Sequence, residues 1–144
     1  MKRIVSLALS LLLAFTLLLS LAACGGKDEG MVNGKYVDMA AYVNSSRMQE
    51  EVKNLEAEGK EQGMDIRLTG EGNELRYTYT FAEELDAEMA APVLEESLET
   101  QTDVFVNLAK SLAGVVAVEE PTVVVSYYNP GEVLVYTRSF TAAG

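Results

Sequence analysis

The chain contains no histidine, no tryptophan and a single cysteine, Cys24. The absence of histidine excludes the usual zinc ligand sets, Cys-His dyads and Ser-His-Asp triads. A single thiol cannot form an internal disulfide, so packing of apolar side chains must stabilise the folded part. The sequence therefore predicts no metal site, no cofactor and no catalytic residue of the nucleophile-and-base kind.

Basic residues are also scarce, with 11 Lys and Arg against 22 Asp and Glu in 144 residues. Two of the 11 stand in the signal segment described next, and their removal leaves nine basic residues and a strongly negative charge. Nucleic acid is excluded as a partner, because phosphate binding needs a basic surface. The same charge disfavours adhesion of the domain's surface to anionic lipid.

The first 24 residues have the three parts of an export signal. Two cations at positions 2 and 3 precede an apolar run over residues 4–21, which is followed by small residues. The motif Leu21-Ala22-Ala23-Cys24 resembles a lipobox, which implies cleavage before Cys24 and a diacylglyceryl thioether on its Sγ. Two alternatives stay open: a permanent transmembrane helix, and an ordinary cleaved signal with an incidental cysteine.

The expected organisation is a lipoprotein signal peptide (1–23), a lipid-anchored flexible tether (24–45) and one domain (46–141). Two acyl chains suffice for stable anchoring, so the expected location is the extracytoplasmic face of the cell membrane. The tether is rich in Gly and polar residues, and its removal is expected to leave folding intact. The exceptions, whose docking on the domain stays open, are Tyr36, Val37, Met39 and Tyr42.

Helical and alternating patterns then follow one another. Ser46 and Gln49 resemble a capping box and predict a helix over 46–61 that ends before Gly63. Alternation over 64–69 and 75–81 predicts a hairpin with one buried face. With Glu71-Gly72 as its loop, the expected pairs are Leu68 with Leu75, Ile66 with Tyr77, and Met64 with Tyr79.

The second half repeats this order. Asp86 is the predicted N-cap of a longer helix that Pro92 should kink or restart and that closes at Gly114. Strands over 122–128 and 133–140 flank a turn centred on Pro130-Gly131. Pairing outward from this turn places Tyr127 opposite Leu134 on the covered face and Tyr128 opposite Val133 on the uncovered face. The fold class is therefore α+β in the order helix-hairpin-helix-hairpin (αββαββ), with two helices on one face of a four-stranded antiparallel sheet.

Three sequence motifs resemble a family of small clostridial-type, Gram-positive lipoproteins that share a domain of unknown function, the DUF4854 family. They are the lipobox, the run Glu71-Gly72-Asn73-Glu74-Leu75 that leads into Tyr77-Thr78-Tyr79, and Val123-Val124-Val125 before a Tyr-Tyr-Asn turn. The resemblance covers about residues 46–140. It implies a location in the cell envelope and supplies no activity or catalytic residues.

The acidic residues offer one route to catalysis. Clusters of two or three Glu at 83–84, 95–99 and 119–120 match no calcium loop and are typical of solvated surface. Two carboxylates can hydrolyse glycosidic bonds without histidine, so a carboxylate-dependent cell-wall or glycan hydrolase is the alternative function.

The leading function is a lipid-anchored binding or interaction module of the cell envelope. The uncovered face of the second hairpin is expected to be unusually apolar and to bind an envelope protein or a second copy. Its candidate interaction patch is Val124, Tyr128, Val133 and Val135. Two alternatives stay open: other residues fold over this face, or the strand phase is reversed.

Overall fold

A computed structural model describes residues 31–143 of the chain. The predicted signal peptide, Cys24 and the first part of the predicted tether lie outside these residues. The described elements are, in chain order, β1 (Met31–Val32), β2 (Lys35–Tyr36), α2 (Met39–Asn44), α3 (Ser46–Glu61), β3 (Met64–Glu71), β4 (Glu74–Phe81), α4 (Ala87–Thr100), α5 (Thr102–Val115), β5 (Thr122–Asn129) and β6 (Val133–Thr141).

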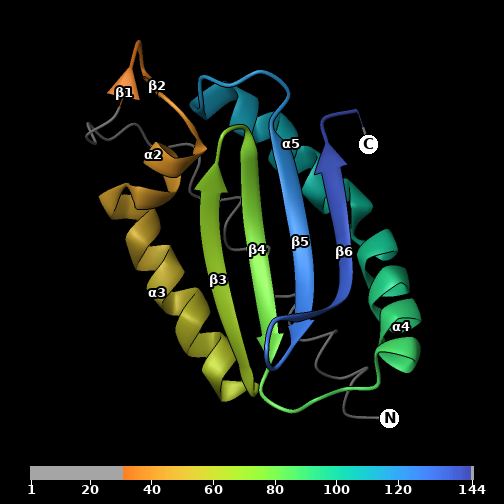
Figure 1. The fold of residues 1–144 in the computed structure, drawn as a ribbon. Helices are drawn as coiled ribbons and strands as arrows, with labels where there is room; N and C mark the ends of the chain where they lie inside the picture. The colour runs from red at the N-terminus through yellow and green to blue at the C-terminus, as the bar shows by residue number, and fades with distance from the viewer. Residues whose placement is uncertain (1–30, 144) are drawn as a thin grey trace.

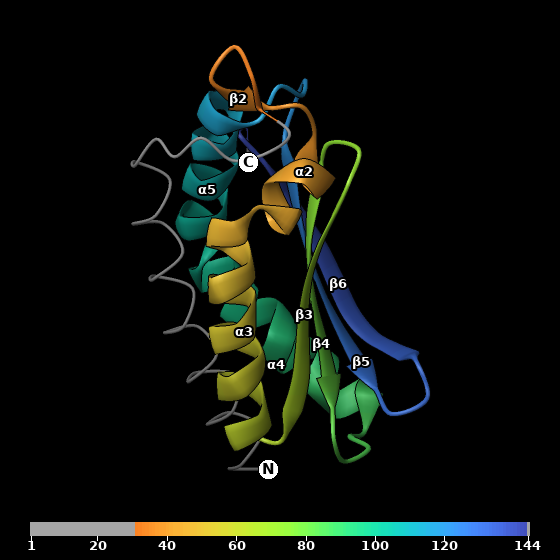
Figure 2. The ribbon, with the colours of Figure 1, turned by 90° about the vertical axis from the view of Figure 1, so that its left-hand side faces the viewer.

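The described residues form a sheet layer and a helix layer (Figure 1). The strand order is β3-β4-β5-β6, and the helices lie on one side of this sheet, which leaves the other side open (Figure 2). Helix α3 packs against β3, whereas α4 and α5 pack against β6. The predicted α+β class and four-stranded sheet are confirmed.

The sheet is not wholly antiparallel, because its central strands β4 and β5 pair in parallel, from Glu74 opposite Thr122 to Thr80 opposite Tyr128. Residues 82–121 connect the two strands. They include α4 and α5 and return the chain to the end of the sheet where β4 begins. Parallel neighbours require a crossover of a dozen or more residues, which these helices supply. Both hairpins lie where the sequence analysis placed them, although their registers differ from the predicted ones. A hairpin does not specify which strand of another hairpin lies beside it.

Helix α3 has the predicted bounds but a different cap. Ser45, one residue before the predicted cap, accepts a hydrogen bond at Oγ from the Met48 amide (3.4 Å). The Gln49 side chain does not close a capping box; its Nε2 donates to the Val43 carbonyl (2.9 Å). Ser45 also ends α2, so one residue terminates one helix and begins the next.

The long second helix is divided, although not at Pro92 as predicted. Asp86 is the N-cap, as predicted, and Pro92 lies inside the continuous helix α4 on an exposed position. The break falls at Gln101, which joins α4 to α5. On either side of it, the hydroxyls of Thr100 and Thr102 donate to the Ser97 and Glu99 carbonyls (2.7 and 2.8 Å). Such side-chain bonds compete with the helical ladder and favour an end at this place.

The β3–β4 register differs by two residues from the predicted one. Leu68 is opposite Tyr77 and Ile66 is opposite Tyr79. The loop is Gly72-Asn73, because a two-residue hairpin loop favours glycine with positive φ at its first position, and Gly72 has φ 58°. A shift of two residues preserves which face each side chain occupies, so the predicted buried face is the observed one.

The core extends into the segment that the sequence analysis assigned to the tether. Tyr36, Met39, Tyr42 and Val43 are all buried. The Ala117 amide donates to the Tyr36 carbonyl (2.8 Å), and a Cβ on Gly70 would lie 2.3 Å from the Met39 carbonyl oxygen. Residues 36–44 therefore belong to the domain, whose packed part begins before the predicted boundary at 46.

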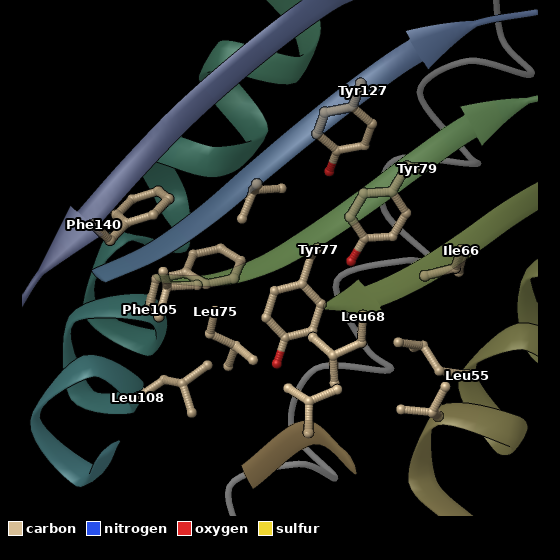
Figure 3. Packing of buried hydrophobic residues seen from close by; sticks show 14 of the residues in the cluster. Leu55, Ile66, Leu68, Leu75, Tyr77, Tyr79, Phe105, Leu108, Tyr127 and Phe140 are labelled. Atoms are coloured by element: carbon tan, nitrogen blue, oxygen red, sulfur yellow. The ribbon is translucent and has the colours of Figure 1, made fainter. Parts of the chain in front are cut away.

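Aromatic side chains fill the space between the sheet and the helices. Tyr79 and Tyr127 stack with their ring centroids 4.8 Å apart, and Phe105 of α5 stacks on Phe140 of β6 at 4.6 Å. Figure 3 shows the rings of Tyr79, Tyr127 and Phe140 on neighbouring strands, with Phe105 of α5 beside Phe140. The buried tyrosines Tyr77, Tyr79 and Tyr127 are therefore core residues.

Candidate functional site on the open sheet face

The β5–β6 hairpin departs from its predicted pairing in two places. Its loop has three residues, Pro130, Gly131 and Glu132, instead of two, so Tyr128 is opposite Leu134 and Asn129 is opposite Val133. A bulge between Tyr127 and Tyr128 then leaves Val135 as an extra residue in β6. Each change shifts the phase by one residue, so the predicted faces are reversed over 133–135 and restored from Tyr136 onward.

These shifts alter the predicted interaction patch. Val124 and Tyr128 lie on the open face, where both are half-buried. Val135 is only 9% exposed and packs in the core, so its assignment to the patch was wrong. Val133 shares the phase of buried Asn129 instead of that of Tyr128, yet it is 56% exposed at the end of the sheet. Leu134, which the sequence analysis placed on the covered face, is 49% exposed opposite Tyr128.

The open face is hollowed beside Tyr128. The hollow has a volume of about 560 Å³ and collects residues from three strands and from the β5–β6 loop. Its lining residues are Asp65, Arg67, Thr78, Thr80, Tyr128, Gly131 and Glu132. The end of the β5–β6 hairpin bends toward the open side (Figure 2), which gives the hollow a wall.

The charged side chains Arg67 and Asp65 of the hollow form a weak, exposed ion pair. Arg67 Nε donates to Asp65 Oδ2 (3.1 Å), and the two side chains are 71% and 48% exposed. An exposed ion pair is worth at most about 1 kcal/mol, so either group can exchange this partner for a ligand at small cost. Arg76 of β4 has a separate partner, since its Nε donates to Glu74 Oε2 (2.8 Å), and this hydrogen bond raises the pKa of Arg76.

Two asparagines fix the loops that surround the sheet. The Leu85 amide donates to Asn129 Oδ1 (2.9 Å), and Asn129 Nδ2 donates to the Leu85 carbonyl (2.8 Å). Asn73 Nδ2 donates to the Glu120 carbonyl (2.9 Å), and the Thr122 amide donates to the Asn73 carbonyl (2.9 Å). Two of the three motifs that carry the family resemblance therefore supply residues that hold the fold together.

The described residues contain little that is typical of catalysis. Asp65 and Glu132 are the two carboxylates of the hollow, and both are exposed, whereas a general acid is usually buried so that it stays protonated. No group of three or more acidic residues within 31–143 is placed to hold a metal ion. No helix in the same range is long and apolar enough to cross a membrane.

Fold and hollow together define a small α+β domain with one open, mostly polar sheet face that carries Tyr128. The chain belongs to the family described as Domain of unknown function (DUF4854), whose model matches residues 39–140. No curated protein matches the chain, and no solved structure matches it. The family match begins at Met39, in agreement with the burial of α2 in the core.

Sequence reasoning missed Leu134 and the hollow. Leu134 was missed because a three-residue loop and a compensating bulge leave no signal in an alternating pattern. The hollow joins Asp65 and Arg67 to residues more than 50 positions later in the chain, and only the pairing of β4 with β5 brings them together.

Proposed function

We propose that this protein is a lipid-anchored, extracytoplasmic binding module, which docks a protein of the cell envelope through the end of its β5–β6 hairpin. Cys24 carries the anchor in this proposal, and the domain acts by contact, without catalysis. The lipobox-like motif supports the anchor, and the shape of the open sheet face supports the docking.

The observation that carries the docking site is the exposure of two adjacent apolar side chains. Val133 and Leu134 are 56% and 49% exposed at the start of β6, whereas Val135 and Phe140 of the same strand are buried. Leu134 lies opposite Tyr128, at the border of the hollow that contains Arg67. Tyrosine and arginine beside an apolar anchor are typical of the residues that dominate binding energy at interfaces.

Charge indicates the kind of partner. The domain is strongly acidic, and the hollow itself contains two carboxylates against one guanidinium. Opposite charge accelerates encounter and disfavours wrong partners. The expected partner therefore presents a basic surface with an apolar side chain that packs against Leu134 and Tyr128.

The test is site-specific photo-crosslinking in intact cells. A photoreactive phenylalanine at position 134 should form a covalent adduct with one envelope protein. The yield of this adduct should fall when the salt concentration is raised before irradiation, because salt screens the attraction between the two proteins. The matched control is position 89 on α4, because Met89 is also apolar and is 44% exposed. Equal labelling from both positions, or no adduct from position 134, would remove the hairpin as the docking site. An adduct with a second copy of the chain would show that the hairpin forms a homodimer instead of docking another envelope protein.

The anchor is tested separately. Metabolic labelling with a palmitate analogue should mark the wild-type protein and should leave the Cys24→Ala variant unmarked. Label that persists in the variant would contradict the lipid anchor without affecting the docking site.

A further inference from the structure

Two exposed valines lie at the end of the molecule where the described chain begins. Val32 belongs to β1, and Val37 lies between β2 and α2. Their side chains are 53% and 43% exposed, which places both among the exposed large apolar residues of the described chain. The short β1–β2 hairpin and the residue that follows it therefore present an apolar surface to their surroundings.

This hairpin is fixed to the rest of the domain. Lys35 Nζ donates to the Ala113 carbonyl near the end of α5 (3.0 Å), where a cation also complements the helix dipole. The Ala117 amide donates to the Tyr36 carbonyl (2.8 Å). The hairpin therefore moves with the domain and lies beside the end of α5 (Figure 1).

The β1–β2 and β5–β6 hairpins lie at opposite ends of the sheet. The Met39 amide donates to the Gly72 carbonyl (3.4 Å), so the β3–β4 loop lies at the same end as α2. Strand β5 begins at this end, since Thr122 is opposite Glu74, and it leads to the β5–β6 loop at the other (Figure 2). A strand of eight residues spans roughly 25 Å, which separates the two hairpins.

The proposed anchor holds the β1–β2 end close to the membrane. Residues 25–30 alone separate Cys24 from Met31. A stretch of this length spans at most about 25 Å when fully extended. Such a short connection keeps the local concentration of the hairpin at the lipid surface high, so a contact too weak to bind by itself can orient the domain.

The distribution of charge favours the same orientation. Outside the four-stranded sheet, the end with the β5–β6 loop carries Lys60 and the carboxylates of Glu58, Glu61, Glu83, Glu84, Asp86, Glu88 and Glu132. The end with the β1–β2 hairpin carries Lys35 and the carboxylates of Asp38, Glu119 and Glu120. A leaflet that contains anionic lipid therefore repels the β5–β6 end more strongly than the β1–β2 end.

We infer that the anchored domain stands on end on the membrane, with the β1–β2 hairpin at the lipid headgroups and the β5–β6 hairpin directed away from them. Val32 and Val37 make the contact with lipid. The inference rests on the proposed anchor, and it specifies the partner proposed above. That partner must offer its docking surface about the length of the sheet beyond the lipid, in an extracytoplasmic domain instead of a membrane-spanning segment.

The test uses tryptophan fluorescence, because the chain contains no tryptophan of its own. Lipidated full-length Val32→Trp and Leu134→Trp are placed in vesicles of phosphatidylcholine and phosphatidylglycerol, with a nitroxide on some headgroups that quenches tryptophan at short range. Val32→Trp should lose most of its fluorescence, whereas Leu134→Trp should keep nearly all of it. The matched control is Met89→Trp on α4, a position that is 44% exposed and should also stay unquenched.

Flotation of the vesicles separates failure of the anchor from failure of the orientation. Protein that does not float with the vesicles would refute the anchor and this inference with it. Protein that floats but is quenched equally at positions 32 and 134 would overturn the orientation and leave the anchor standing. Quenching mainly at position 89 or 134 would overturn it as well, because the domain would then lie on its side or be inverted.

Reversal of charge at the far end tests why the domain stands. In the Leu134→Trp background, Glu83→Lys with Glu84→Lys should increase quenching on vesicles with phosphatidylglycerol and leave it unchanged on pure phosphatidylcholine. The matched pair, Glu119→Lys with Glu120→Lys at the other end, should leave position 134 unquenched on both. Quenching at position 134 that does not respond to the first pair would contradict the inference that charge orients the domain.

Discussion

Asn129 fixes the position of the hairpin that forms the wall of the hollow. Its side chain is buried and makes two hydrogen bonds to Leu85, one to the amide (2.9 Å) and one to the carbonyl (2.8 Å). Leu85 lies in the segment between β4 and α4, and Asn129 is the last residue before the β5–β6 loop. The pair therefore ties this loop to the neighbouring segment of chain.

Asn129→Ala should lower the free energy of unfolding by about 2–4 kcal/mol. Each lost hydrogen bond costs about 1 kcal/mol, and the part-buried Leu85 amide and carbonyl then lose their protein partner at further cost. For a domain of this size, that loss corresponds to a fall in Tm of roughly 10–20 °C. Urea denaturation followed by circular dichroism measures the free energy, and differential scanning calorimetry measures Tm.

Asn129→Asp adds a pH dependence whose sign is fixed by the structure. The carboxylate keeps the acceptor for the Leu85 amide but sets a negative oxygen against the Leu85 carbonyl, and burial raises its pKa above the unfolded value of about 3.9. A raised folded pKa contributes stability below the unfolded pKa and loses it as pH rises through the folded pKa. The variant should therefore resemble Asn129→Ala at pH 7 and approach the wild type near pH 4, where its hydroxyl donates to Leu85.

The wild type measured at each pH is the control for general acid effects. A loss below about 1 kcal/mol in Asn129→Ala would mean that Leu85 readily finds other partners. A gap between Asn129→Asp and wild type that stays constant from pH 7 to 4 would show that the carboxylate does not occupy the site of the amide. Either result would refute the assignment of Asn129 as the clamp.

Three further predictions follow from the core. Removal of residues 1–44 should abolish the cooperative unfolding transition seen by circular dichroism, because it strips four buried side chains, each worth about 2–5 kcal/mol, from a domain of marginal stability; a sharp transition in the truncated protein would return this segment to the tether. Gly70→Ala should destabilise the fold by about 2 kcal/mol or more, since the added Cβ would clash with the Met39 carbonyl. Gly114 lies in α5, where the added Cβ of Gly114→Ala meets nothing, and this variant should be more stable by about 0.5–1 kcal/mol. Urea denaturation that ranks the two variants in the opposite order would contradict the contact between α2 and β3. Burial raises the pKa of Tyr42 to about 12 and also raises the pKa of Tyr77 and Tyr127. Because these pKa values are higher in the folded state than in the unfolded state, the contribution of the three tyrosines to the free energy of unfolding is fully present below about pH 10 and is lost as pH rises above it. Tyr127→Phe should reduce the slope of unfolding free energy against pH above 10 by about 1.4 kcal/mol per unit, and an unchanged slope would show that Tyr127 ionises without unfolding.

The sequence by itself determined the local elements. The bounds of α3, the N-cap at Asp86 and the buried faces of β3, β4 and β5 all follow from caps and periodicities that act within a few residues. Such signals depend on neighbouring residues alone, so they are readable without a partner. The prediction of the buried faces was not affected by the two-residue error in the β3–β4 register, because side chains of a strand alternate between its faces with a period of two residues.

Only the tertiary structure decided how the elements meet. The parallel pairing of β4 with β5 places Thr78 beside Ser126 and Thr80 beside Tyr128, and it thereby creates the hollow. Nothing in either hairpin's alternation specifies its neighbour, since both present one apolar face of similar width. The docking of α2 and the bulge at Val135 are likewise decided by packing across the whole core, where the free energy of burial outweighs local preference.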